Sequence, residues 1–148
     1  MEAVTYESDI KTIFSSEKVV FAVLSDLNNL QKLRDKLPEN DTVKDLQFDV
    51  DSCSFSVQGV GKIGFRITRR DPTNTIVFAV ENTMITANAW IQLKQVAEND
   101  TRMKLTLKAE LPQMMKMLVD KKLKEGINMI AEKLAEGLSV ATTEMERV

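Results

Sequence analysis

The sequence contains no histidine and a single cysteine, and these two scarcities exclude several classes of chemistry. Without histidine, the Ser-His-Asp hydrolases, the Cys-His proteases and the usual zinc proteases are excluded. Cys53 has no second cysteine with which to form an intrachain disulfide or a Cys-x-x-Cys motif. We therefore predict that the chain holds no metal and no cofactor, and we assign no catalytic residue.

Long apolar runs and an excess of positive charge are also missing. The longest apolar run extends from Val19 to Leu24, far short of the roughly 20 residues that cross a bilayer. The start of the chain is acidic and alternating, so we expect no signal peptide, no integral membrane segment and a cytoplasmic protein. The formal net charge is -2, which argues against a dedicated nucleic-acid binder.

Glycine and proline are scarce, with 5 and 3 residues, and there is no repeat, low-complexity tract or linker. The 148 residues, of which 43% are hydrophobic, match the size and balance of one ordinary globular domain. We predict that residues 1–148 form a single domain. Nothing in the sequence indicates an oligomeric state.

The first third of the chain predicts one strand and two short helices. Residues 4–14 alternate between apolar and polar side chains, as in a strand with one face exposed to solvent. Ser15-Ser16 supplies a helix N-cap, and apolar residues then follow at helical spacing. Asn28-Asn29 is expected to divide this stretch into two helices, the second of which stops before Pro38.

The rest of the chain predicts a series of strands and then one long helix. From Leu46 to Ala109, six segments alternate with period two and are separated by turn residues, which predicts an antiparallel meander. From about Pro112 the apolar period becomes helical. The pattern predicts an amphipathic helix of more than twenty residues that ends at Gly137.

This order of elements resembles the helix-grip fold of the START-related, pollen-allergen-like superfamily called SRPBCC, which includes polyketide cyclases and lipid-transfer proteins. Residues 15–30, a capped helix followed by Leu24-Ser25-Asp26 and a second short helix, are similar to the family's segment after its first strand. The resemblance implies an α+β fold in which a curved seven-stranded antiparallel sheet surrounds the C-terminal helix, with an apolar cavity between them. No catalytic residue of the cyclase or hydroxynitrile branches aligns with this chain, so the resemblance does not imply an enzyme.

The segment from Gly59 to Gly64 matches G-x-G-x-x-G, the pattern of dinucleotide-binding loops. In those loops the glycines connect a strand to a helix whose N-terminus receives the pyrophosphate. Here Phe65 and Ile67 continue with period two, so the motif opens a strand. We interpret it as a hairpin turn or bulge.

The inward faces of the predicted strands are almost entirely apolar. No Asp, Glu, Lys or Arg lies on an inward face in this register, while Arg66, Glu81 and Lys94 fall on the outer face. Catalysis inside the cavity is therefore not expected, because acid-base chemistry needs a titratable group beside the substrate. We predict that a ligand would be bound by Tyr6, Phe55, Phe65, Phe78, Ile91, Met103, Met115, Lys116, Val119 and Leu123.

Three features of the last helix have two interpretations each. Lys116 lies within the apolar stripe, where its ammonium could meet a ligand's carboxylate or phosphate, or could extend to water along its stem. Gly126 on the same stripe could leave room for a ligand or allow close approach to the sheet. Flexible thioethers suit an adaptable pocket or an irregular core, and the candidates are Met84, Met103, Met114, Met115, Met117 and Met129.

Three functions remain open at this level. The leading one is non-enzymatic binding of a small hydrophobic molecule, such as a lipid or a polyketide-like compound. The second is a protein-interaction module whose interior is filled by its own side chains and whose outer surface, around Trp90, binds a partner. The third is a cyclase-type enzyme, which the absence of histidine and of inward acids makes less favoured.

Overall fold

The structure is a computed structural model that describes residues 2–33, 43–57, 61–82 and 86–146. Within these ranges the elements, of which η1 is a 3-10 helix, are β1 (Glu2–Glu7), β2 (Lys11–Ile13), α1 (Glu17–Leu24), η1 (Leu27–Leu33), β3 (Val43–Phe48), β4 (Ser52–Val57), β5 (Gly61–Asp71), β6 (Thr75–Glu81), β7 (Thr86–Ala97), β8 (Asp100–Leu111) and α2 (Gln113–Glu146).

All the strands belong to one antiparallel sheet with the order β1-β8-β7-β6-β5-β4-β3, in which β2 also pairs with β8. The meander predicted from Leu46 onward is confirmed, since each strand from β3 to β8 pairs with the next. The strand predicted over residues 4–14 is divided in two at Ser8. The Ser8 N–H donates to the Leu105 carbonyl, and the Ser8 hydroxyl accepts from the Leu105 N–H, each at 2.9 Å.

The two short helices are confirmed, but the break between them lies earlier than predicted. Ser16 is the N-cap of α1, and its hydroxyl accepts a hydrogen bond from the Val19 N–H at 3.3 Å. α1 ends at Leu24, and Ser25 is its C-cap. The Asp26 carboxylate then accepts from the Asn28 N–H at 3.0 Å, a local turn that starts η1. Asn28-Asn29 therefore lies inside η1 rather than between the helices.

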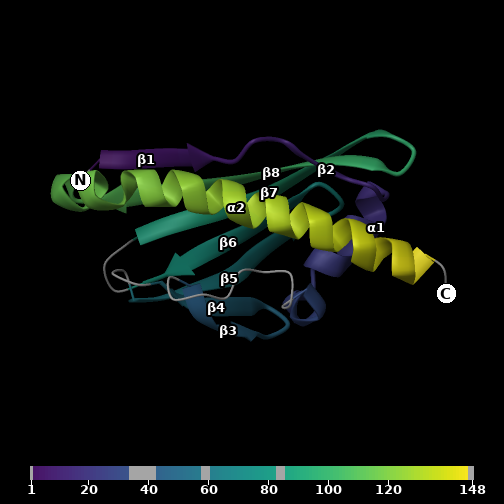
Figure 1. Cartoon of the computed structure of the whole chain (residues 1–148), viewed down its shortest axis with the longest axis horizontal. Coiled ribbons are helices and arrows are strands. Elements are labelled where there is room, and N and C mark those ends of the chain that lie inside the picture. Colours follow the sequence, from purple (N-terminus) through teal and green to yellow (C-terminus); the bar gives the residue numbers. More distant parts are fainter. Residues whose placement is uncertain (1, 34–42, 58–60, 83–85, 147–148) are drawn as a thin grey trace.

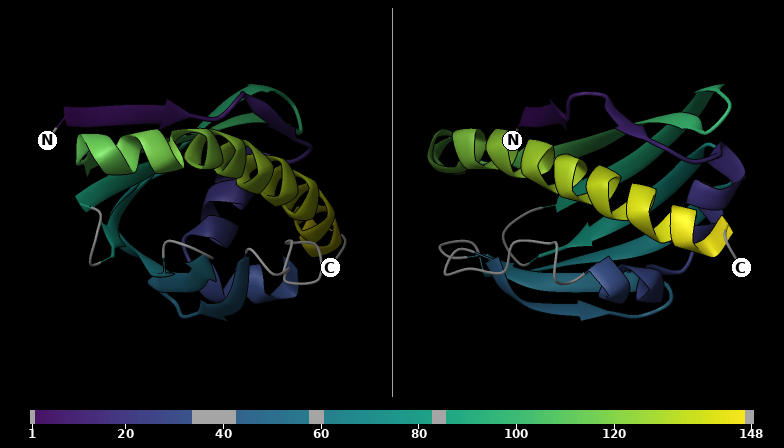
Figure 2. Two further views of the ribbon diagram at one scale, coloured as in Figure 1. Left: turned by 60° about the vertical axis from the view of Figure 1, so that its left-hand side comes forward. Right: turned by 45° about the vertical axis from the view of Figure 1, so that its right-hand side comes forward.

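α2 has 34 residues and continues past Gly137, so the predicted helix end is wrong. Gly137 is buried, as are Leu134 and Leu138 beside it, which makes this glycine part of the packed face of the helix. Figures 1 and 2 show α2 crossing the curved sheet obliquely, from the end near β1 to the side where α1 lies. Among the described residues, no helix is long and apolar enough to span a membrane.

The motif between Gly59 and Gly64 opens a strand, as predicted, for the part that the structure describes. Gly61 begins β5 with a φ of 94°, a backbone conformation that favours glycine, and Gly64 lies within the same strand. Gly59 and Val60 lie outside the described residues. The described residues of this segment, Gly61 to Gly64, lie in a strand and so form no helix N-terminus for a pyrophosphate.

The buried apolar residues form two separate clusters on the inner side of the sheet. The larger cluster joins α1, η1, the central strands and the C-terminal half of α2. The smaller cluster consists of Ala87, Ala109, Leu111 and Val119. α2 packs mainly against β1, β2 and β8, at one edge of the sheet, and against α1 and η1. The inner face of β3 to β6 therefore lies away from the main contacts of α2.

Candidate functional site

A row of phenylalanines crosses the inner face of the sheet on three neighbouring strands. Phe55 on β4 and Phe65 on β5 are stacked with ring centroids 5.7 Å apart, and Phe65 meets Phe78 on β6 edge to face at 6.4 Å. Phe78 is buried, whereas Phe55 and Phe65 are only half-buried. These contacts confirm the inward orientation that the alternation predicts, and they leave two aromatic rings partly accessible.

Seven of the ten residues that the sequence predicts as ligand contacts belong to one of the two clusters or pack against it, and Tyr6, Phe55 and Lys116 belong to neither. Phe78, Ile91 and Met103 are buried in the larger cluster, and Phe65 packs against it. Val119 belongs to the smaller cluster, with Met115 and Leu123 half-buried against it. The structure therefore does not gather all ten residues into one continuous wall.

The space between the two clusters is bordered by apolar side chains that are only partly buried. On the sheet these include Val80 and Leu107, and on α2 they include Ile127 and Ile130. Gly126, on the same side of α2, would place a Cβ atom in open space, with no atom of the described residues within 4 Å. The helix face at Gly126 therefore has room for a larger side chain.

A polar contact between β1 and α2 lies beside the smaller cluster. The Tyr6 hydroxyl, on an almost fully buried side chain, donates to Asp120 Oδ1 at 2.8 Å. Lys124 Nζ lies 3.5 Å from Asp120 Oδ2. Burial and the neighbouring carboxylate raise the pKa of Tyr6 to about 12, so its hydroxyl stays protonated. The hydrogen bond from Tyr6, together with the charges of Lys124 and Lys116, holds the pKa of the Asp120 carboxyl below its usual value.

Asp120 is a charged residue beside the predicted ligand contacts that the sequence did not single out. The only available signal was the tyrosine itself, because a buried phenol needs a hydrogen-bond partner. Nothing in the spacing of the helix assigns that partner to residue 120, since the two residues are 114 positions apart in the sequence. The expectation of an uncharged lining concerned the strands, whereas Asp120 lies on α2 with a partly exposed carboxylate.

A bulge in β5 places an arginine on the inner face, which corrects the expectation of an uncharged lining. Ile67 pairs with Phe78, but after the bulge Arg70 pairs with Ile76. Phe78 and Ile76 are both buried, so the shift by one residue turns Arg70 to the core side of the strand end. Strict alternation along the strand does not predict such a shift in register.

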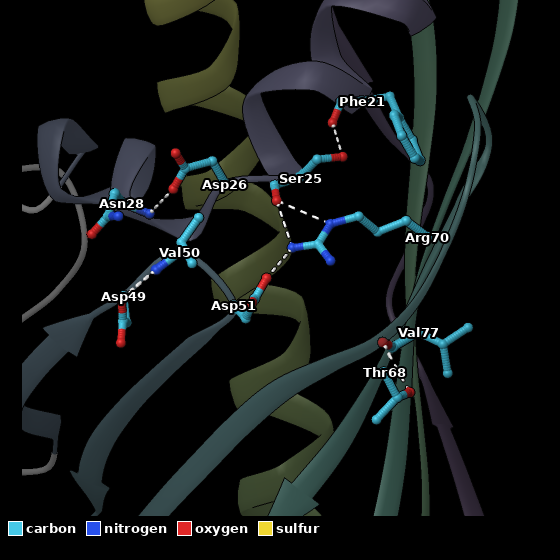
Figure 3. Close-up of polar contacts among 10 residues, drawn as sticks. All are labelled: Phe21, Ser25, Asp26, Asn28, Asp49, Val50, Asp51, Thr68, Arg70 and Val77. Carbon is cyan, nitrogen blue, oxygen red and sulfur yellow. Dashed lines mark hydrogen bonds and ion pairs between the residues drawn. The ribbon is translucent and has the colours of Figure 1, made fainter.

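The contacts of Arg70 are structural. Its guanidinium donates to the Ser25 carbonyl from Nε at 3.1 Å and from Nη2 at 2.8 Å, and Nη2 also contacts Asp51 Oδ1 (Figure 3). Ser25 caps the C-terminus of α1, where a positive charge is favourable, and Asp51 lies in the turn between β3 and β4. Arg70 therefore joins α1 and this turn to β5, and we assign it no ligand.

A separate pocket of about 380 Å³ is formed by residues of β3, β4 and β5, at the edge of the sheet opposite β1. It is lined by Asp45, Leu46, Gln47, Ser56 and Lys62, so four of its five residues are polar. None of them is among the ten predicted ligand contacts. Among the described residues, no three His, Cys, Asp or Glu side chains are grouped so that they could hold a metal ion.

Comparison with solved structures identifies the architecture. Norcoclaurine synthase from Thalictrum flavum, in complex with a transition-state analogue, superposes with a TM-score of 0.74 at 12% identity and covers 99% of both chains. The chain has the helix-grip fold. A conserved protein from Geobacillus kaustophilus shares this fold with a TM-score of 0.65 at 14% identity, covering 95% of this chain and 96% of that one. No family model and no curated protein sequence matches the chain.

The helix-grip fold and the sequence resemblance agree on the α+β architecture, with a curved antiparallel sheet, two short helices and a long C-terminal helix. The resemblance was based on element order, and identities of 11% to 14% with the similar structures explain why residue matches carried little of it. The fold is what these structures have in common with this chain.

The predicted cluster of methionines does not form as a group in this helix-grip domain. Met114 and Met117 are exposed, Met115 is half-buried in the smaller cluster, and Met103 is buried in the larger one. Met84 lies outside the described residues. The side chains of Met114 and Met117 belong to the outer face of α2, because their positions on the helix lie opposite Val119.

Cys53 gives a direct test of the strand register. It is half-buried on the inner face, packed against the larger cluster, and burial raises the pKa of its thiol to about 12. Because the thiolate is the reactive form, we expect labelling by an aromatic disulfide reagent at pH 8 to be much slower in the native protein than in urea. Equal labelling rates in the two states would contradict the inward placement of Cys53.

Proposed function

We propose that the protein binds a small hydrophobic molecule, such as a lipid or a polyketide-like compound, between the sheet and α2. The observation that supports this proposal most is the partial exposure of apolar side chains on the inner side of the sheet and on α2. Apolar side chains on facing elements, Phe65 on β5 and Leu123 on α2 among them, are half-buried although they lie on the inner side. Removing such surfaces from water stabilises a complex by about 25 cal/mol per Å² of buried apolar area.

The predicted ligand contacts take different roles in this proposal. The half-buried rings of Phe55 and Phe65 offer flat apolar surfaces, and Met115 offers an adaptable one. Four of the predicted contacts are already buried and would pack behind the residues that touch the ligand: Phe78, Ile91, Met103 and Val119. Tyr6 is engaged by Asp120 and holds α2 against β1.

Lys116 would distinguish acidic from neutral ligands. Its side chain is half-buried one turn before Val119, and its charge acts on the Asp120 carboxylate. A carboxylate or phosphate at the polar end of a ligand would gain a charge-assisted contact from the ammonium group. Of the two interpretations of Lys116, the proposal adopts the one in which its ammonium group meets the acidic group of a ligand.

A protein of the same fold holds small aromatic molecules. The norcoclaurine synthase structure in complex with dopamine and hydroxybenzaldehyde superposes with a TM-score of 0.72 at 11% identity and covers 97% of this chain and 88% of that one. The shared fold supports an interior site in this chain. It does not transfer the reaction of that enzyme.

The proposal is tested by thermal unfolding with dodecanoate and with dodecan-1-ol, which share a chain and differ in charge. A ligand at one hundred times its dissociation constant stabilises by about 2.7 kcal/mol. For a domain of this size we expect both probes to raise the melting temperature by several degrees.

Lys116→Met should weaken dodecanoate selectively, by about tenfold, and should leave dodecan-1-ol unchanged, because only the charged end loses a partner. The matched control is Lys94→Met, which changes an exposed lysine on β7 and should alter neither response. Absence of any shift with both probes in the unmodified protein would refute the proposed function.

A further inference from the structure

The start of α2 carries an unusual surface of exposed large apolar side chains. Met114, Met117 and Leu118 are 79%, 80% and 75% exposed, more than any other large apolar residue among those described. Their spacing of three and four residues places them together on the outer face of the first two turns. We call these three residues the apolar tip. In Figures 1 and 2 this end of α2 lies at the extremity of the molecule, beside the N-terminus.

Lysines follow directly behind the apolar tip. Lys121, Lys122 and Lys124 are exposed on the next turn, and we call them the lysine collar. The stretch from residue 112 to residue 124 contains four lysines and one aspartate, although the whole chain has a net charge of -2. Two carboxylates lie among these lysines: Asp120 accepts from Tyr6 and lies 3.5 Å from Lys124, and Glu125 lies 3.9 Å from Lys121. The four lysines exceed these two acids by two charges, so this end of α2 keeps a positive excess.

We infer that the start of α2 docks on a lipid surface that contains anionic lipids, with the apolar tip inserted and the lysine collar on the head groups. Four residues of helix separate Met117 from Lys121, a rise of about 6 Å. With the N-terminal end of α2 pointing into the bilayer, Met117 would lie about 6 Å deeper than Lys121, which is within the depth of about 5–10 Å at which apolar side chains are buried at the boundary between head groups and acyl chains. The positive end of the helix dipole lies at the same end and adds to the attraction.

The shape of the surface favours a lipid bilayer over a protein partner. The tip consists of long, unbranched or singly branched side chains that are at least 75% exposed. Such side chains fit a fluid interface, which has no fixed shape, whereas a protein partner would have to supply a complementary groove. The inference does not rest on the proposed ligand, although Met115 and Val119 lie on the opposite face of the same turns.

The test is co-sedimentation of the protein with vesicles of phosphatidylcholine alone and with about 30% phosphatidylserine. We expect binding to the anionic vesicles, weak binding to the neutral ones, and loss of binding at about 1 M salt, where the Debye length is about 3 Å. Lys121→Glu with Lys122→Glu should weaken binding at least about tenfold, since each lysine near an anionic surface contributes about 1 kcal/mol. Met114→Ser, Met117→Ser and Leu118→Ser together should weaken it by at least as much.

Matched controls come from equally exposed residues elsewhere. Ile10→Ser with Phe14→Ser replaces apolar residues that are 65% and 67% exposed, and Lys94→Glu with Lys108→Glu reverses two lysines on the strands. Both control variants should bind as the unmodified protein does. The inference is overturned if the unmodified protein ignores anionic vesicles, or if the tip and collar variants bind no worse than these controls. Circular dichroism checks that each variant is folded.

Discussion

Replacing Leu138 with alanine should lower the free energy of unfolding by about 2–5 kcal/mol, the cost of a large cavity in a packed core. Leu138 is fully buried in the C-terminal half of α2, within the cluster that also contains Leu24 of α1 and Leu27 of η1. The side chain therefore joins three helices to the sheet. Urea unfolding followed by circular dichroism measures the loss.

Leu123→Ala is the matched comparison, because it makes the same change on the same helix. The sequence places Leu123 in the middle of the apolar stripe, but the structure leaves its side chain half-buried against the smaller cluster. We expect the loss of stability at Leu123 to be less than half of that at Leu138, since less apolar surface is returned to water. Equal losses would show that α2 is anchored along its whole length and would contradict the half-buried state of Leu123.

Gly126→Leu should abolish the stabilisation of about 2.7 kcal/mol that dodecanoate gives at one hundred times its dissociation constant. A leucine side chain at this position would extend into the open space next to Gly126, between the half-buried residues of α2 and the sheet. The measurement is the melting temperature with and without dodecanoate. A full ligand response in Gly126→Leu would place the ligand elsewhere.

Gly126→Ala is the matched control, because it removes the glycine from the helix without placing a large side chain in the ligand's space. A single Cβ meets no atom of the described residues within 4 Å, so it introduces no clash. Alanine in place of glycine in a helix interior should stabilise the free protein by about 0.5–1 kcal/mol. The ligand response should remain, and its loss in this variant would mean that the glycine acts through flexibility of α2.

The parts of the fold that depend on local periodicity could be predicted from the sequence. Apolar residues two apart identified β3 to β8, and the change to helical spacing after Pro112 identified α2. The N-cap at Ser16 was also readable, because a hydroxyl before a helical pattern has a direct local role. The end of α2 was not, since Gly137 is equally compatible with a helix end and with a buried helix face.

The candidate site was predictable in composition but less so in arrangement. Alternation places Phe55 and Phe65 on the inner face whatever the curvature of the sheet, and the structure agrees. Which of these residues are packed and which are accessible depends on where α2 lies, and no local pattern contains that information. Arg70 and Asp120 were missed for the same reason: one depends on a bulge and the other on a contact between distant segments.

The pairing of both β1 and β2 with β8 has a consequence for the order in which the chain assembles. Residues 2–13 are synthesised before the rest of the sheet, and their partner strand begins only at Asp100, so β1 and β2 can pair only after the intervening strands have been made. Hairpins between neighbouring strands close short loops and can form early, whereas this edge must close a loop of nearly the whole meander. β1 and β2 thus leave the ribosome before the other strands of this sheet and join it last, and until then β8 presents an open edge to other chains.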